Sequence, residues 1–189
     1  MADNYIDSVK KLFRYYKMLG EKTFDQLSDD QLNWKFNEES NSIATIVKHM
    51  SGNMLSRWTD FLTSDGEKGW RQRDAEFEDD LTSRIEILKK WNEGWACLFS
   101  TLDKLTENDL EKEVFIRNMG QSVTDAINRQ LTHYAYHVGQ IVFIGKMAAD
   151  KKWVSLTIPK GNSTNYNDDK FSLPKRTEHF TDKYSGEKK

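Results

Sequence analysis

Two histidines lie four residues apart in the segment LTHYAYHVGQ, residues 131–140, of a chain that contains only four histidines. In an α-helix, residues i and i+4 are one turn apart on the same face. The imidazoles of His133 and His137 can therefore converge on one metal ion, because a neutral imidazole nitrogen is a common ligand of divalent metals. Taken alone, the spacing is a weak signal, because two histidines at this spacing on a half-buried helix more often serve only packing.

A third histidine, His49, lies in the middle of a segment whose apolar residues repeat at helical spacing. A buried imidazole there needs a partner for each nitrogen, or a metal ion. In helical bundles, metal sites are assembled from side chains that project inward from facing helices. Three neutral imidazoles leave the charge of a divalent ion uncompensated and at least one coordination position open, as in a catalytic site. We therefore predict a metal site formed by His49, His133 and His137.

The surrounding residues exclude one class of enzyme and leave the chemistry open. Tyr134 follows His133, so HYAYH is not the HExxH motif, which needs a glutamate there as the base of a metalloprotease. Four polar residues on the same helix faces are expected to orient the ligands or to bind substrate: Asn53, Gln130, Gln140 and Arg129. Polar positions packed against water are an alternative for the three amides, and a solvated side chain for the arginine. No catalytic residue is identified.

Composition narrows the class of protein. The chain has 189 residues, of which 37% are hydrophobic and 12% aromatic, enough for one core. The 28 basic and 30 acidic residues give a net charge of -2, so a nucleic-acid partner is not expected. The single cysteine cannot form an internal disulfide, and we find neither a signal peptide nor a run of about 18 apolar residues. We expect a cytoplasmic protein that does not enter a membrane.

Apolar periodicity predicts four long amphipathic helices in an antiparallel four-helix bundle, an all-α fold. The predicted helices span about residues 3–27, 43–64, 81–104 and 123–148, with Ser42 or Asn41 capping the second and Ser122 the fourth. Residues 28–42 are expected to be a connection, and EVFIRN an extended or strand-like one. We assign residues 1–150 to the bundle and 151–189 to an irregular extension whose last dozen residues are expected to be disordered.

Two segments carry a resemblance to a known family. The segment IATIVKHMSGNMLSRW and, about eighty residues later, LTHYAYHVGQI resemble the DinB superfamily (DinB/YfiT-like), over about residues 5–150. The segment WVSLTIPKGNSTNYN further resembles a Bacillus-centred subgroup that is described only as a domain of unknown function. The resemblance implies a four-helix bundle with a three-histidine metal site, and it assigns the ligand role to His49, His133 and His137.

The same resemblance implies a function. Characterised relatives include mycothiol-dependent maleylpyruvate isomerase and transferases that use bacillithiol or other low-molecular-weight thiols. A thiol-dependent S-transferase acting on a small molecule is therefore the favoured interpretation, with a metal-dependent hydrolase as a variant. Alternatives are a non-catalytic metal-binding protein, a homodimer formed through surplus aromatic residues, and a metal-free protein whose histidines are hydrogen-bonded. Zinc is the default metal, although nickel, iron, cobalt or manganese suits the same ligands.

Overall fold

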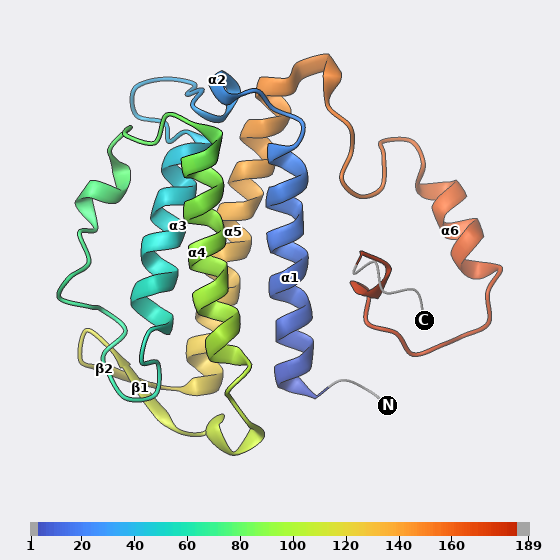
Figure 1. The fold of residues 1–189 in the computed structure, drawn as a ribbon. Helices are drawn as coiled ribbons and strands as arrows, with labels where there is room; N and C mark the ends of the chain where they lie inside the picture. The colour runs from blue at the N-terminus through green and yellow to red at the C-terminus, as the bar shows by residue number, and fades with distance from the viewer. Residues whose placement is uncertain (1–3, 185–189) are drawn as a thin grey trace.

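The computed structural model describes residues 4–184 and is mostly helical, with a small two-stranded sheet (Figure 1). This agrees with the prediction of an all-α fold. The helices and strands are α1 (Tyr5–Phe24), α2 (Asp29–Leu32), α3 (Ile43–Trp58), the 3₁₀ helix η1 (Asp74–Phe77), α4 (Arg84–Leu102), η2 (Glu107–Asp109), β1 (Glu113–Ile116), β2 (Met119–Ser122), α5 (Val123–Ala149), η3 (Asp150–Lys152), α6 (Ser163–Phe171) and η4 (Asp182–Tyr184).

The long helices begin at polar capping residues. The Ser42 hydroxyl accepts a hydrogen bond from the backbone N–H of Thr45 at the start of α3, and Ser122 accepts one from Asp125 at the start of α5. These bonds satisfy N–H groups that have no partner inside the first helical turn. Both caps were predicted, and Ser42 rather than Asn41 is the residue that caps α3.

The core is formed where the four long helices meet. Each contributes one fully buried aromatic residue to a cluster of edge-to-face and tilted rings: Phe13 of α1, Trp58 of α3, Trp95 of α4 and Tyr134 of α5. The ring centroids of Phe13 and Trp58 are 6.1 Å apart, and those of Trp95 and Tyr134 are 6.0 Å apart. Such contacts stabilise a core beyond the burial of apolar area. These four aromatic residues therefore serve the core.

The helices do not all alternate in direction, and the predicted antiparallel order is wrong for α3 and α4. Trp58, at the end of α3, accepts a hydrogen bond from Thr101, near the end of α4, so the two helices run parallel (Figure 1). Residues 59–83 make this possible, because they return along the length of α3, about 24 Å for its 16 residues. We call residues 59–83 the crossover. The crossover contains η1, which packs against the outer side of α3.

Two other features differ from prediction. Helix α3 ends at Trp58 rather than near residue 64, because Thr59 is extended and Asp60 has a left-handed φ of 49°. The connection over residues 28–42 contains the short helix α2, which a capping box at Ser28 starts.

The extended EVFIRN segment is the first strand of a hairpin. Its turn residues Arg117 and Asn118 both have positive φ, as a two-residue hairpin turn requires. The Asp65 carboxylate of the crossover accepts hydrogen bonds from both of their backbone N–H groups, at 2.9 and 2.8 Å. The crossover therefore holds the hairpin beside the end of α3.

The C-terminal extension is not irregular throughout, since it contains α6 (Figure 1). Pro159 and Pro174 flank this helix and the residues between 162 and 173 include neither proline nor glycine, which permits one short helix there. Of the last dozen residues, 185–189 lie outside the described part. The others return to α1, where the ring of Phe180 packs against Tyr15 at 5.5 Å. Within residues 4–184, no helix has the length and apolar character needed to cross a membrane.

Candidate metal centre

The fold brings the three predicted histidines together. His49 lies on α3, and His133 and His137 lie one turn apart on α5, which runs antiparallel to α3. Each residue offers a ring nitrogen, and the three nitrogens lie within 4.8 Å of one another. The Nε2 atoms of His133 and His137 are 3.0 Å apart. Ligand nitrogens around a tetrahedral zinc ion are about 3.3 Å apart for Zn–N distances near 2.05 Å, so this group could hold a metal.

The outward nitrogens of two of these rings have oxygen partners. His49 Nδ1 lies 3.0 Å from Oε2 of Glu76, and His137 Nδ1 lies 2.8 Å from Oε1 of Gln140. A carboxylate oxygen and an amide oxygen can each only accept a hydrogen bond. Each ring therefore donates its Nδ1–H outward. The lone pair of each ring is then on Nε2, the nitrogen free to act as a ligand. In the metal-free state, His133 can donate its own Nε2–H to His137.

Burial favours the neutral form of the two imidazoles on α5. Burial lowers the pKa of His133 to about 3, with smaller contributions from the neighbouring His137 and His49 and from the guanidinium groups of Arg57 and Arg71. The pKa of His137 is also lowered, chiefly by burial. A proton and a metal ion compete for the same nitrogen lone pair. Because His133 resists protonation, metal ions face little competition from protons at neutral pH.

A buried chain of charges lies behind His49. Arg71 donates two hydrogen bonds to the Glu76 carboxylate, from Nε to Oε1 at 2.7 Å and from NH2 to Oε2 at 2.8 Å. Burial alone would raise the pKa of Glu76, but the hydrogen bonds from Arg71 and His49 outweigh it and the pKa is lowered. Glu67 lies between Arg71 and Arg57, at 3.6 and 3.2 Å. Of the residues named here, the three from the crossover are Glu67, Arg71 and Glu76, and the other two come from α3.

Two of the four polar residues that were predicted to orient ligands or bind substrate have hydrogen-bond partners in the structure. Gln140 contacts His137, as described above, and its Nε2 donates to Tyr136 at 3.1 Å. The buried Asn53 accepts a hydrogen bond from the Tyr134 hydroxyl at 2.9 Å, and that hydroxyl accepts one from Trp58 at 3.1 Å. The Asn53 oxygen is thus part of the aromatic core, and the structure does not place it on a histidine.

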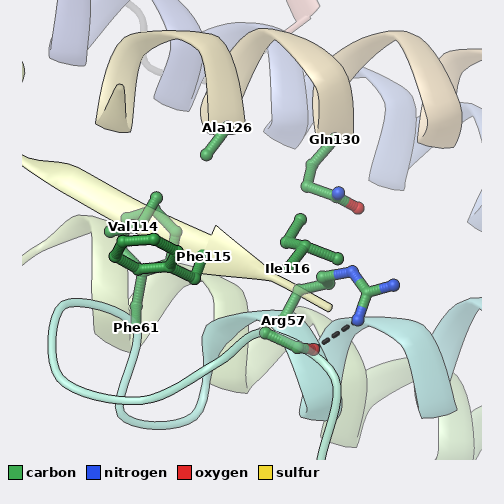
Figure 2. A pocket seen from close by; sticks show the side chains of 8 residues that line it. Arg57, Phe61, Val114, Phe115, Ile116, Ala126 and Gln130 are labelled. Carbon is green, nitrogen blue, oxygen red and sulfur yellow. Dashed lines mark hydrogen bonds between the residues drawn. The ribbon is translucent and has the colours of Figure 1, made fainter. Parts of the chain in front are cut away.

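The remaining two differ in exposure. Arg129 is exposed to solvent, whereas Gln130 is buried one turn before His133. The Gln130 side chain faces Arg57 and Ile116 across a cavity of about 10 Å³ (Figure 2). Its Oε1 is buried without a hydrogen-bond partner among the described residues. A cavity of this size has room for about one water molecule, which would satisfy that oxygen.

Sequence reasoning missed Glu76 and Arg71, which lie between the second and third predicted helices. Their distance from His49 along the chain follows no motif. The only available signal is the general need of a buried imidazole for a partner on its second nitrogen.

Comparison with known proteins gives one family. The model of the family described as "Protein of unknown function (DUF1572)" matches residues 1–162. The chain belongs to this family. The match to DUF1572 includes all three histidines and the whole crossover, and it ends one residue before α6. No curated protein and no solved structure matches the chain significantly.

Proposed function

We propose that this DUF1572 protein is a metal-dependent enzyme whose divalent ion is held by His49, His133 and His137. The observation that carries the proposal is the convergence of the three ring nitrogens within 4.8 Å, from two helices. The hydrogen-bonded Nδ1 atoms of His49 and His137 support it, because they leave Nε2 free to coordinate. We further propose that the four long helices form a bundle of the DinB type.

The site is half open, which favours catalysis over a closed structural role. His133 and His137 are only partly buried, while His49 behind them is buried. Three protein ligands leave a coordination position for a small molecule, as in catalytic zinc sites. A divalent ion bound there supplies positive charge that lowers the pKa of a thiol or a water molecule. The residues of the chain hold the ion and exclude solvent from its buried side.

The reaction class we propose is S-transfer, in which a low-molecular-weight thiol such as bacillithiol is joined through its sulfur to an electrophilic small molecule in the cytoplasm. A carbon–sulfur bond forms, the electrophile's leaving group departs, and the thiol's proton is released with it. No cysteine joins the three-histidine group in the described part of the chain, so the nucleophilic sulfur would come from the small molecule. The resemblance of LTHYAYHVGQI to the DinB superfamily supports the same class. Hydrolysis by an activated water is the variant that the same open position permits.

The proposal is tested first by metal content. Native-purified protein is analysed for zinc, nickel, iron, cobalt and manganese, beside His49→Ala, His133→Ala and His137→Ala. We expect near-stoichiometric metal in the wild type and its loss in each variant. His179→Ala is the matched control, because this histidine lies in the tail near Ser8 and belongs to no metal-ligand group within residues 4–184. A wild type that neither contains metal nor takes it up would refute the proposal.

Reaction class is tested next on the metal-loaded protein. Bacillithiol and a chromogenic electrophile are supplied together, and the rate is compared with the rates without thiol, without protein and with His133→Ala. We expect protein-dependent consumption of thiol and electrophile in equal amounts. Turnover that is independent of thiol would assign the hydrolase variant instead.

A further inference from the structure

Outside the three-histidine group, His49 has a hydrogen-bond partner on the crossover, the carboxylate of Glu76. Glu76 lies on η1, and its side chain is 8% exposed, as is that of His49. One of its oxygens lies 3.0 Å from His49 Nδ1. The ring of Phe77, the next residue, stacks on the His49 imidazole at a centroid distance of 5.0 Å. The short helix η1 thus contacts both the edge and the face of the ring.

The position of this carboxylate is fixed from its other side. Arg71, whose side chain is 2% exposed, donates hydrogen bonds to both Glu76 oxygens in a bidentate ion pair. Burying a carboxylate is costly unless it is paired and its remaining lone pairs are bonded. Here Oε2 accepts from both Arg71 and His49. If His49 carried its proton on Nε2 instead, the lone pair of Nδ1 would face this oxygen and the hydrogen bond would be lost. Gly52, one turn after His49, leaves the space that the carboxylate fills.

We propose that Glu76, clamped by Arg71, is a positioning residue that holds His49 as its Nδ1–H tautomer, with Nε2 directed at the metal. The inference rests on the proposed metal site and adds the group that orients one of its ligands. A carboxylate acceptor raises the basicity of the opposite nitrogen and fixes the ring, which strengthens metal binding. The corresponding acceptor on His137 is the uncharged, partly exposed Gln140, and charge-assisted bonds are the stronger kind. Glu76 is therefore expected to matter more than Gln140.

A purely structural role for the Arg71–Glu76 pair makes a different prediction. Such a pair would tie the crossover to α3. It would leave the His49 proton distributed between Nδ1 and Nε2 as in a free imidazole. The tautomer is therefore the property that separates the two roles. It can be measured without metal, so it remains informative whether or not the proposed function is correct.

The first experiment records long-range ¹H–¹⁵N NMR spectra of the metal-free full chain near neutral pH. In the wild type we expect His49 to carry its proton on Nδ1 alone. Glu76→Ala removes the acceptor, and we expect His49 to shift towards the Nε2–H form. Glu76→Gln keeps an acceptor oxygen of the same shape and should retain much of the Nδ1–H form. The matched control, Glu78→Ala, removes an exposed carboxylate two residues away and should change nothing.

The second experiment titrates the same proteins with zinc alone. We expect Glu76→Ala to weaken zinc binding about 10- to 100-fold, Glu76→Gln to weaken it less, and Glu78→Ala to match the wild type. If Glu76→Ala does not fold, Glu76→Gln beside Gln140→Ala decides the question, because the proposal requires the larger loss at Glu76. Wild type that takes up neither zinc nor nickel, iron, cobalt or manganese refutes the proposed function but leaves the tautomer result standing. The inference is overturned if wild-type His49 is protonated on Nε2, or if zinc binding is unchanged in both Glu76 variants.

Discussion

Gly52→Ala is a single-methyl change that tests the arrangement of α3, Glu76 and His49 together. A Cβ at position 52 would lie 2.7 Å from the carboxyl carbon of Glu76 and closer still to Oε1. To restore a van der Waals separation of ~3.5 Å, the carboxylate must retreat by about 1 Å. Arg71 holds that carboxylate at 2.7 and 2.8 Å, so it cannot retreat without weakening the pair or the bond to His49.

Two opposing terms set the magnitude. Alanine in a helix interior ordinarily stabilises a protein by ~1 kcal/mol relative to glycine. Hydrogen bonds to charged groups contribute about 1.5–3 kcal/mol each, and the substitution disturbs those that Glu76 makes to Arg71 and His49. We therefore expect the free energy of unfolding to fall by ~1–3 kcal/mol. Because His49 loses its fixed acceptor, zinc affinity should fall by roughly 10-fold or more.

The assay compares urea unfolding of the metal-free proteins with zinc titration of the folded ones. Gly139→Ala is the matched control, because Gly139 is also inside a helix and an added Cβ there meets nothing within 4 Å. That control should gain up to ~1 kcal/mol in stability and keep the zinc affinity of the wild type. If Gly52→Ala is as stable as Gly139→Ala and binds zinc as the wild type does, the reasoning about Glu76 is refuted.

Three further outcomes follow from the same structure. The pKa of His133 is about 3 when folded and near 6.5 when unfolded, so the metal-free protein should lose stability as pH falls from 6.5 towards 3. Urea midpoints should show a shallower loss for His133→Gln, and an equal loss would contradict this. Tyr134→Phe leaves Trp58 Nε1 and the Asn53 oxygen without a partner, so unfolding free energy should drop by ~1–3 kcal/mol while metal stoichiometry stays unchanged. Loss of metal in that variant would place the hydroxyl at the site. Ser83→Ala removes the capping box of α4 and should cost ~1 kcal/mol, measured by thermal unfolding.

Local sequence determined the helices and the histidine pair. Apolar periodicity located the four long helices, because a buried stripe must recur every 3.6 residues. Ser42 and Ser122 marked two helix starts, because a hydroxyl can satisfy the free N–H groups of the first turn. His133 and His137 were predicted to be neighbours from their spacing alone, since one helical turn places residues i and i+4 together. Joining His49 to them required the further assumption that both helices face one interior.

Only the tertiary structure decided how the site is completed. Periodicity shows which face of a helix is buried but not which way the next helix runs, and the parallel course of α3 and α4 depends on the path of the crossover. That path brings Glu76 to His49 across 27 residues of sequence, a separation that no helical or strand repeat relates. Asn53 illustrates the same limit, because its helix face was predicted while its partner, Tyr134, lies on another helix. Contacts within one turn follow from backbone geometry, whereas contacts between elements depend on how the whole chain packs.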